Sequence, residues 1–86
     1  MTATSTLSGR DRAILRAVAA GGAQLELGAE AVLFFDGRSC CDQIAAHRLV
    51  RAGLIDAAAL GLVGHRVVAV LTPAGYQALD AYARAA

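Results

Sequence analysis

The sequence predicts one small α+β domain with three helices and one or two β-hairpins. Three segments show apolar residues at helical spacing, each beside residues that start or end a helix. Between them lie short alternating or continuous apolar runs closed by glycine-containing turns, as in hairpin strands. The chain of 86 residues is long enough for one hydrophobic core and too short for two.

The composition limits how much apolar bulk this core can contain. Hydrophobic residues make up 57% of the chain, but much of this is alanine, and there are only two Phe, two Tyr and no Trp. A chain this small with few large side chains is marginally stable on its own. We therefore expect a homodimer or another protein partner to add stability.

The charge is close to balanced. All eight cationic side chains are arginine, and with seven carboxylates the formal net charge is +1. A dedicated nucleic-acid domain is usually strongly basic, so DNA affinity would require local clustering of arginine. No apolar stretch reaches the roughly 18 residues of a membrane span. We expect no membrane association, a cytoplasmic location, and disorder over residues 1–7, where a Thr/Ser-rich lead lacks the features of a signal peptide.

The first predicted helix runs over residues 8–20. Ser8 and Asp11 fit a capping box, with Asp in place of the usual Glu. Gly21 and Gly22 then end the helix. The helical apolar stripe is formed by Ile14, Leu15 and Val18.

A hairpin is predicted next. Residues 23–27 alternate between polar and apolar side chains, as a half-buried strand does. Residues 32–35 form a continuous apolar run, and Asp36-Gly37 is a turn signal. A helix over residues 29–35 is the alternative for this segment, and the sequence leaves both readings open.

The second predicted helix runs from Ser39, as its N-cap, to Ala52, with Asp42 at the third position. At 100° per residue, the face expected to be buried holds Cys41, Ile44, Ala45, Arg48, Leu49 and Ala52. The other face holds Ser39, Gln43, Ala46, His47, Val50 and Arg51. Because Arg48 falls on the apolar face, we expect it to pair with a carboxylate such as Asp36 or Asp56.

The last third of the chain predicts a second hairpin and a third helix. Gly53 ends the second helix, and Leu54-Ile55 begins a short strand that returns through residues 65–71. Thr72-Pro73 is a strong helix start, because Pro is favoured at the first helical position.

Two motifs in this part of the chain resemble winged-helix transcriptional regulators of the MarR-like and PadR-like groups. The first is Arg-Leu-Val-Arg-Ala-Gly-Leu-Ile at residues 48–55. The second is Leu-Thr-Pro-Ala-Gly at residues 71–75. The likeness covers residues 39–79 and implies a small winged-helix-like domain. In such a domain, residues 39–52 would be the recognition helix and residues 56–64 the wing.

The resemblance implies a DNA-binding regulator, with double-stranded DNA and a second copy of the chain as partners. Helix 39–52 would enter the major groove, and the first and third helices would form the homodimer contact. The expected DNA-contacting residues are Ser39, Gln43, His47 and Arg51 on the helix, with His65 and Arg66 at the base of the wing. Gln can pair with adenine, and Arg with guanine or phosphate.

The wing also supports a second hypothesis. Residues 57–64 carry no cation, whereas Leu60, Leu62 and Val63 would suit a protein surface. In this reading the chain is a winged-helix-like interaction module, such as an inhibitor encoded by a phage or mobile element.

No catalytic constellation or cofactor motif is found, so we do not expect an enzyme. His47 and His65 lie on different expected elements, and no glycine-rich loop connects a strand to a helix. The adjacent Cys40 and Cys41 are expected to be reduced thiols, one of them facing the core. A metal site is not expected, because Cys40 and His47 would lie about 10 Å apart along the helix axis.

Overall fold

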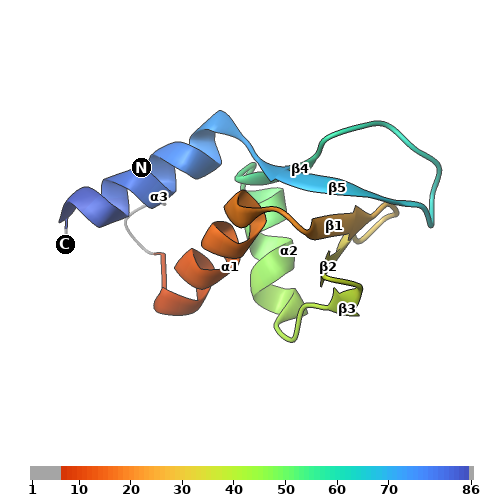
Figure 1. Cartoon of the computed structure of the whole chain (residues 1–86), viewed down its shortest axis with the longest axis horizontal. Helices are drawn as coiled ribbons and strands as arrows, with labels where there is room; N and C mark the ends of the chain where they lie inside the picture. Colours follow the sequence, from red (N-terminus) through yellow and green to blue (C-terminus); the bar gives the residue numbers. More distant parts are fainter. Residues whose placement is uncertain (1–6, 86) are drawn as a thin grey trace.

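The computed structural model describes residues 7–85, with side chains as far as Asp80 (Figure 1). Disorder was expected for residues 1–7, and residues 1–6 of that segment lie outside the described range. No helix within the described range is both long and apolar enough to cross a membrane. The elements follow in the order α1 (Gly9–Ala20), β1 (Ala23–Glu26), β2 (Val32–Phe35), β3 (Arg38–Ser39), α2 (Gln43–Arg51), β4 (Ile55–Ala57), β5 (Arg66–Leu71) and α3 (Pro73–Ala85).

The strands form one five-stranded sheet in the order β3-β2-β1-β5-β4, with every neighbouring pair antiparallel. Both expected hairpins are confirmed, since β1 pairs with β2 and β4 with β5. The segment whose state was left open is strand β2 followed by a turn at Asp36 (φ 51°) and Gly37 (φ 83°). The pairing of β1 with β5 joins the two hairpins into one sheet.

Helices α1 and α2 pack against one face of this sheet, which we call the inner face (Figure 1). Along β1 and β5, every second side chain points to this face, as the period of a strand requires. These side chains are buried except for Val67, which is half-buried. Large buried side chains are few, and alanines and a cysteine complete the core. The buried apolar residues are Ile14, Leu15, Val18, Ala23, Leu25, Leu33, Cys40, Ala45, Ala46, Leu49, Leu54, Ile55, Ala69, Leu71 and Ala78.

The opposite, outer face of the sheet has no such cover among the described residues. Val68 and Val70 point outward from β5 and are 56% and 39% exposed. Arg66 precedes them on the same face, opposite Glu26 of β1, and Asp56 of β4 lies opposite Val70. The outer face is therefore a mixture of valine and charged side chains with the ring of Phe34, against which Arg66 packs.

The start of α1 is fixed as the sequence predicts. The Asp11 backbone N–H donates to the Ser8 hydroxyl, and the Ser8 N–H donates to the Asp11 carboxylate, each at 3.0 Å. Asp11 is only 3% exposed, and its second oxygen accepts a hydrogen bond from Arg48 at 2.7 Å. The expected pairing of Arg48 with a carboxylate is confirmed, but the named partners Asp36 and Asp56 were wrong. Asp11 is the partner because α1 and α2 pack side by side.

Helix α2 begins later than predicted. Ser39 is not its N-cap, because Ser39 pairs with Phe34 in the short strand β3. Asp42 is the N-cap instead, and its carboxylate accepts the Ala45 N–H at 2.9 Å.

The buried face of α2 also differs from the prediction. Ile44, expected in the core, is 79% exposed, and Cys41 is exposed while Cys40 is buried. The helix buries Ala45, Ala46 and Leu49 instead. The two alanines permit a close approach to the sheet and α1, and this close packing replaces the burial of the larger isoleucine.

Four chain segments meet where α2 ends and α3 begins. Gly53 turns the chain with φ 80°, a conformation that glycine adopts without strain. The Thr72 hydroxyl donates to the Gly53 carbonyl, and the Thr72 N–H donates to the Leu54 carbonyl at 3.0 Å. Gly75, in the first turn of α3, lies against the same Leu54 carbonyl. We call Gly53, Leu54, Thr72 and Gly75 the junction.

The junction generates a stability prediction. A methyl group at Gly75 would overlap the Leu54 carbonyl oxygen, which is backbone and cannot rotate away. We expect Gly75→Ala to lower the free energy of unfolding by about 1–3 kcal/mol, the usual cost of overpacking, in chemical denaturation. Gly9→Ala is the matched control. Its added methyl meets only Arg12 Nη2, at 3.6 Å, so stability should be unchanged or higher. Equal stabilities of the two variants would contradict this account of the junction.

Candidate nucleic-acid interface

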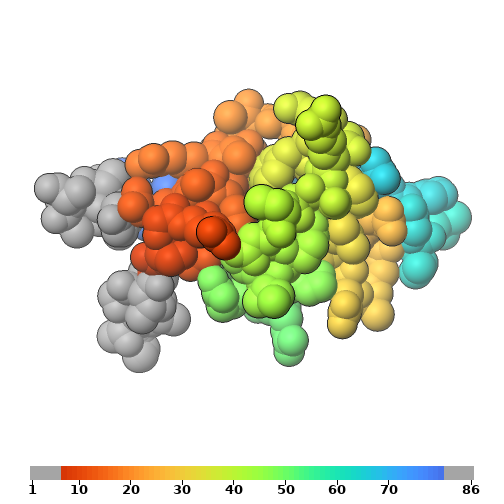
Figure 2. Space-filling model, turned by 90° about the horizontal axis from the view of Figure 1, so that it is seen from below, coloured from red at the N-terminus to blue at the C-terminus, as the bar shows by residue number. Residues whose placement is uncertain are grey.

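The exposed side of α2 forms a continuous ridge of four side chains, Ile44, His47, Arg48 and Arg51. They surround a shallow hollow with a volume of about 390 Å³. Figure 2 shows this side of the molecule, with α2 (green) at the centre and α1 (red and orange) beside it. We refer to these four residues as the α2 ridge.

The way α2 packs determines which side chains form the ridge. The buried Ala45, Ala46 and Leu49 face the sheet and α1. Residues on the opposite side of the helix therefore project to solvent. Arg48 and Arg51 lie in the last turn, where cations interact favourably with the helix dipole. The ridge therefore combines two guanidinium groups, an imidazole and an exposed isoleucine.

Two carboxylates partly balance the cations near the ridge. Arg48 pairs with buried Asp11, but its own side chain remains 58% exposed. Arg10 of α1 pairs with Asp42 at 3.0 Å. Hydrogen bonds from the Ala45 N–H and from Arg10 hold the pKa of Asp42 below its usual value of 3.8. In turn, the hydrogen bond to the Asp42 carboxylate raises the pKa of Arg10. Arg10 thereby offsets the negative charge at the start of α2.

The near-neutral net charge conceals an uneven distribution. Helices α1 and α2 with their N-caps carry five arginines against two carboxylates, a formal charge of +3. The strands and turns over residues 21–41 and 52–72 carry two arginines against four carboxylates, a formal charge of −2. The helical layer is therefore basic, and the sheet and its turns are acidic.

Gln43, predicted to read a base, is instead bonded to the protein backbone. Its amide nitrogen donates to the carbonyls of Leu33 and Cys40 at 3.1 and 2.7 Å, and its amide oxygen accepts the Leu33 N–H at 3.3 Å. In this conformation its amide is engaged by β2 and the turn before α2. Gln43 positions the helix, and we remove it from the candidate interface.

Three other predicted contacts lie away from the α2 ridge. Ser39 is an exposed residue of β3, and His65 is exposed just before β5. Arg66 lies on the outer face, with its guanidinium 3.7 Å from the centre of the Phe34 ring and 3.7 Å from the Glu26 carboxylate. The structure thus brings only His47 and Arg51 of the predicted set together.

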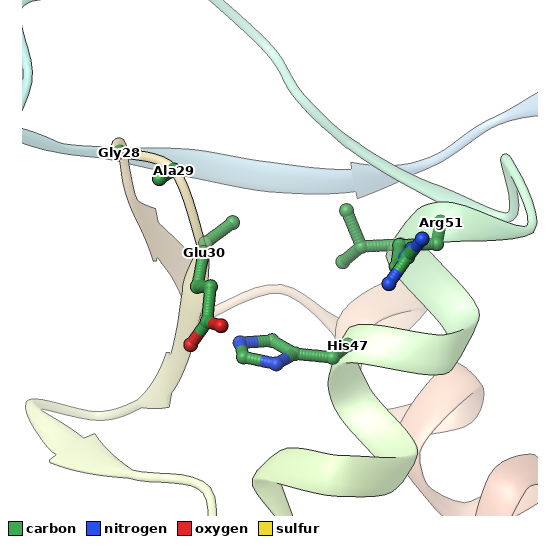
Figure 3. A pocket seen from close by; sticks show the side chains of 7 residues that line it. Gly28, Ala29, Glu30, His47 and Arg51 are labelled. Atoms are coloured by element: carbon green, nitrogen blue, oxygen red, sulfur yellow. The ribbon is translucent and has the colours of Figure 1, made fainter.

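His47 and Arg51 also border a larger pocket, of about 540 Å³, between α2 and the turn after β1. Figure 3 shows the His47 ring directed toward the Glu30 carboxylate from the opposite wall, with Arg51 one turn further along α2. The Nε2 atom of His47 is buried and has no hydrogen-bond partner. This pocket therefore contains groups of both charges beside the ridge.

The loop between β4 and β5 exposes its apolar side chains. Leu60, Leu62 and Val63 are 100%, 70% and 84% exposed. Gly61 between them lies against Leu27 and Val67, which holds the loop to the end of the sheet. The three side chains proposed as a partner surface are thus free to contact another molecule.

Sequence reasoning missed Ile44 and Arg48 as ridge residues. A signal for Arg48 was present, because Asp11 falls on the same helical stripe as Leu15 and Val18. A carboxylate on a buried stripe requires a cation or hydrogen-bond donors, and Arg48 on the next helix supplies one. No comparable signal distinguishes Ile44 from the core residues Ala45 and Leu49.

No family model, curated protein or solved structure matches this chain. Both cysteines are free thiols. No group of three or more potential metal ligands occurs among the described residues. Function is therefore inferred from the chemistry of the site itself.

The Gln43 contacts predict a structural role for this residue. Gln43→Ala removes three hydrogen bonds and takes the side-chain partner from the Leu33 N–H and the Cys40 carbonyl. The Leu33 carbonyl keeps the Cys40 N–H as its donor, at 2.8 Å. Each unsatisfied buried group costs about 1–3 kcal/mol, so we expect a loss of about 2 kcal/mol in urea unfolding. Gln24→Ala, on the half-buried outer side of β1, is the control and should cost less. A Gln43→Ala variant as stable as the wild type would show that these bonds do not hold α2 in place.

The Asp42 contacts predict a dependence of stability on pH. Because the folded-state pKa of Asp42 is lowered, its contribution is present above its usual pKa and is lost as the pH falls through the folded value. Unfolding of the wild type and Asp42→Asn should be compared between about pH 5 and pH 2. Asn retains a capping oxygen but cannot titrate. The stability difference between the two proteins should shrink as the pH falls, and a constant difference would contradict the assignment.

Proposed function

We propose that this protein is a small DNA-binding regulator that uses the α2 ridge as its contact with the major groove. The observation that carries this proposal is the ridge itself, two arginines and a histidine on an exposed helix within a basic layer. The helix is narrow enough to enter a B-DNA major groove, which is about 12 Å wide.

The arrangement of the elements also supports this proposal. Strands β1, β5 and β4 are neighbours in the sheet, β4 and β5 form a hairpin, and α1 and α2 lie on one face. A hairpin of β4 and β5 directly after α2 is the order of elements that the resemblance to winged-helix regulators implies. The β2–β3 hairpin departs from that pattern, because it occupies the place in the chain where a helix-turn-helix has its first short helix.

The chemistry of the ridge suits both phosphate and base contacts. Arg51 and Arg48 can donate to phosphate oxygens or to the acceptors of guanine, and Ile44 can contact a thymine methyl group. Arg10 shields Asp42, whose carboxylate at the start of α2 would otherwise repel the phosphate backbone. Ile44 and the arginines replace Gln43 as the proposed reading residues.

A second candidate function rests on the loop between β4 and β5. The fully exposed Leu60 and its neighbours Leu62 and Val63 form an apolar surface without cations, a composition that suits a protein partner better than DNA. In this case the chain is an interaction module that acts through another protein.

The proposed DNA contact can be tested by fluorescence anisotropy with a labelled duplex. We expect wild-type binding to weaken log-linearly with salt, because each neutralised phosphate releases a counterion. Arg48→Ala combined with Arg51→Ala should weaken binding at least about tenfold and reduce the salt slope by about 2, one for each lost phosphate contact. Because Arg48 is also the partner of the buried Asp11 carboxylate, circular dichroism checks that the double variant is folded.

Arg66→Ala is the control, because it removes one guanidinium from the opposite face of the sheet. Its salt slope should equal that of the wild type. Absence of wild-type binding at about 50 mM salt, where the phosphate contribution is large, would favour the interaction module. A double variant that binds like the wild type would place the DNA contact elsewhere on the protein.

A further inference from the structure

The Asp11 carboxylate lies inside the domain and is held in one orientation. Its two oxygens have separate donors. The Ser8 N–H donates to Oδ2 at 3.0 Å, and Nη2 of Arg48 donates to Oδ1 at 2.7 Å. Because Asp11 is only 3% exposed, water does not compete effectively for these bonds. The start of α1 therefore presents a fixed acceptor to the Arg48 side chain of α2.

Arg48 is held by this acceptor without being covered. One nitrogen of its guanidinium bonds to Asp11, and the side chain remains 58% exposed on the α2 ridge. The guanidinium makes no other hydrogen bond within the described part of the chain. A guanidinium carries its N–H donors in a rigid planar fork, so a bond to one nitrogen restricts the direction of the others. Arg48 thus offers oriented donors to solvent.

Arg51, the next arginine of the α2 ridge, has no such restraint. Its side chain is exposed, and the described residues provide no ion pair or hydrogen bond to its guanidinium. A free arginine loses conformational entropy when it is ordered by a ligand. Arg48 has already lost much of this freedom when the protein folds. The two arginines carry the same charge but differ in how far they are organised before binding.

We propose that Asp11 is a positioning residue for the DNA contact, and this inference rests on the proposed function of the α2 ridge. Asp11 does not touch DNA. It orients Arg48 so that the free part of the guanidinium can donate to two neighbouring acceptor atoms. Both a phosphate group and the major-groove edge of guanine offer such a pair of acceptors to arginine.

The direction of the effect on DNA affinity separates positioning from charge. By charge alone, a carboxylate beside the ridge opposes a polyanion, so its removal would strengthen DNA binding. Positioning requires the opposite, because Arg48 would become as free as Arg51. The second pair of the helical layer provides a matched comparison. Asp42 bonds to Arg10, which lies outside the α2 ridge, so removal of the Asp42 charge leaves Arg48 oriented.

The first test measures anisotropy of the same labelled duplex with Asp11→Asn and Asp42→Asn. The single amide oxygen of Asn cannot serve both Ser8 and Arg48 as two carboxylate oxygens do. We expect Asp11→Asn to bind about three- to tenfold more weakly, the effect of one long side chain that must be ordered on binding. Asp42→Asn should bind as tightly as the wild type or more tightly. Circular dichroism checks that both variants are folded. A folded Asp11→Asn variant that binds equally or more tightly would overturn the proposal.

A double-mutant cycle separates positioning from a general effect on the fold. In the Arg48→Ala background, Asp11→Asn should change DNA affinity by less than about twofold, because the side chain that it positions is gone. Equal losses in both backgrounds would contradict the proposal. Gly75→Ala, altered at the junction and away from the ridge, is the control for stability. It should bind DNA like the wild type at a temperature where it is folded.

The wild-type protein provides a test that needs no variant. In nuclear magnetic resonance spectra of the chain without DNA, we expect the Arg48 guanidinium to rotate slowly and that of Arg51 to rotate freely. An Arg48 as mobile as Arg51 would overturn the proposal.

The results also distinguish this proposal from the proposed function. A wild type that binds no duplex refutes the proposed function, and with it any role of Asp11 in a DNA contact. Duplex binding that depends on Arg48 but is not weakened by Asp11→Asn overturns the positioning role alone and leaves the ridge as the DNA contact.

Discussion

The junction of Gly53, Leu54, Thr72 and Gly75 is the constraint on which the rest of the structure depends. One backbone carbonyl, that of Leu54, accepts the Thr72 N–H and also lies against the bare Cα of Gly75. This contact fixes the end of α2, the start of β4, the end of β5 and the start of α3 relative to one another. Strand β5 pairs with β1 and so joins the two hairpins. The position of β5 therefore determines how the two hairpins are placed in the sheet.

The two faces of the sheet have different chemistry. The inner face is covered by a helical layer with a formal charge of +3, which presents the α2 ridge. The outer face has exposed valines and charges of both signs. A single five-stranded sheet thus separates the basic helical layer from a face with exposed valines and charges of both signs. The small overall charge results because the basic helical layer is offset by carboxylates in the sheet and its turns.

Local features of the fold could be predicted from the sequence, because they depend on a few neighbouring residues. The capping box of Ser8 and Asp11, the two hairpins and the helix start at Thr72 are examples. Contacts between distant segments were not encoded in this way. The hydrogen bonds between the Gln43 side chain and the Leu33 backbone form only in the tertiary structure. The same is true of the pairing of Ser39 with Phe34, which places Ser39 in β3 and not in α2. The phase of α2 was therefore predicted only in part. Ala45 and Leu49 are buried as expected, but Ile44 is exposed and Ala46 is buried, since alanine gives no strong apolar signal.

The pairing of β1 with β5 has a consequence for how the chain folds. Gln24 lies opposite Val68, so the central pairing of the sheet closes a loop of about half the chain. Such long-range contacts slow folding, because the entropy of loop closure is lost before the contact forms. During synthesis α1, the β1–β2–β3 segment and α2 leave the ribosome before β5. Until then one side of β1 has unpaired backbone groups, a template for pairing with other chains. The nascent protein is thus most prone to aggregation in the interval before Leu71 emerges.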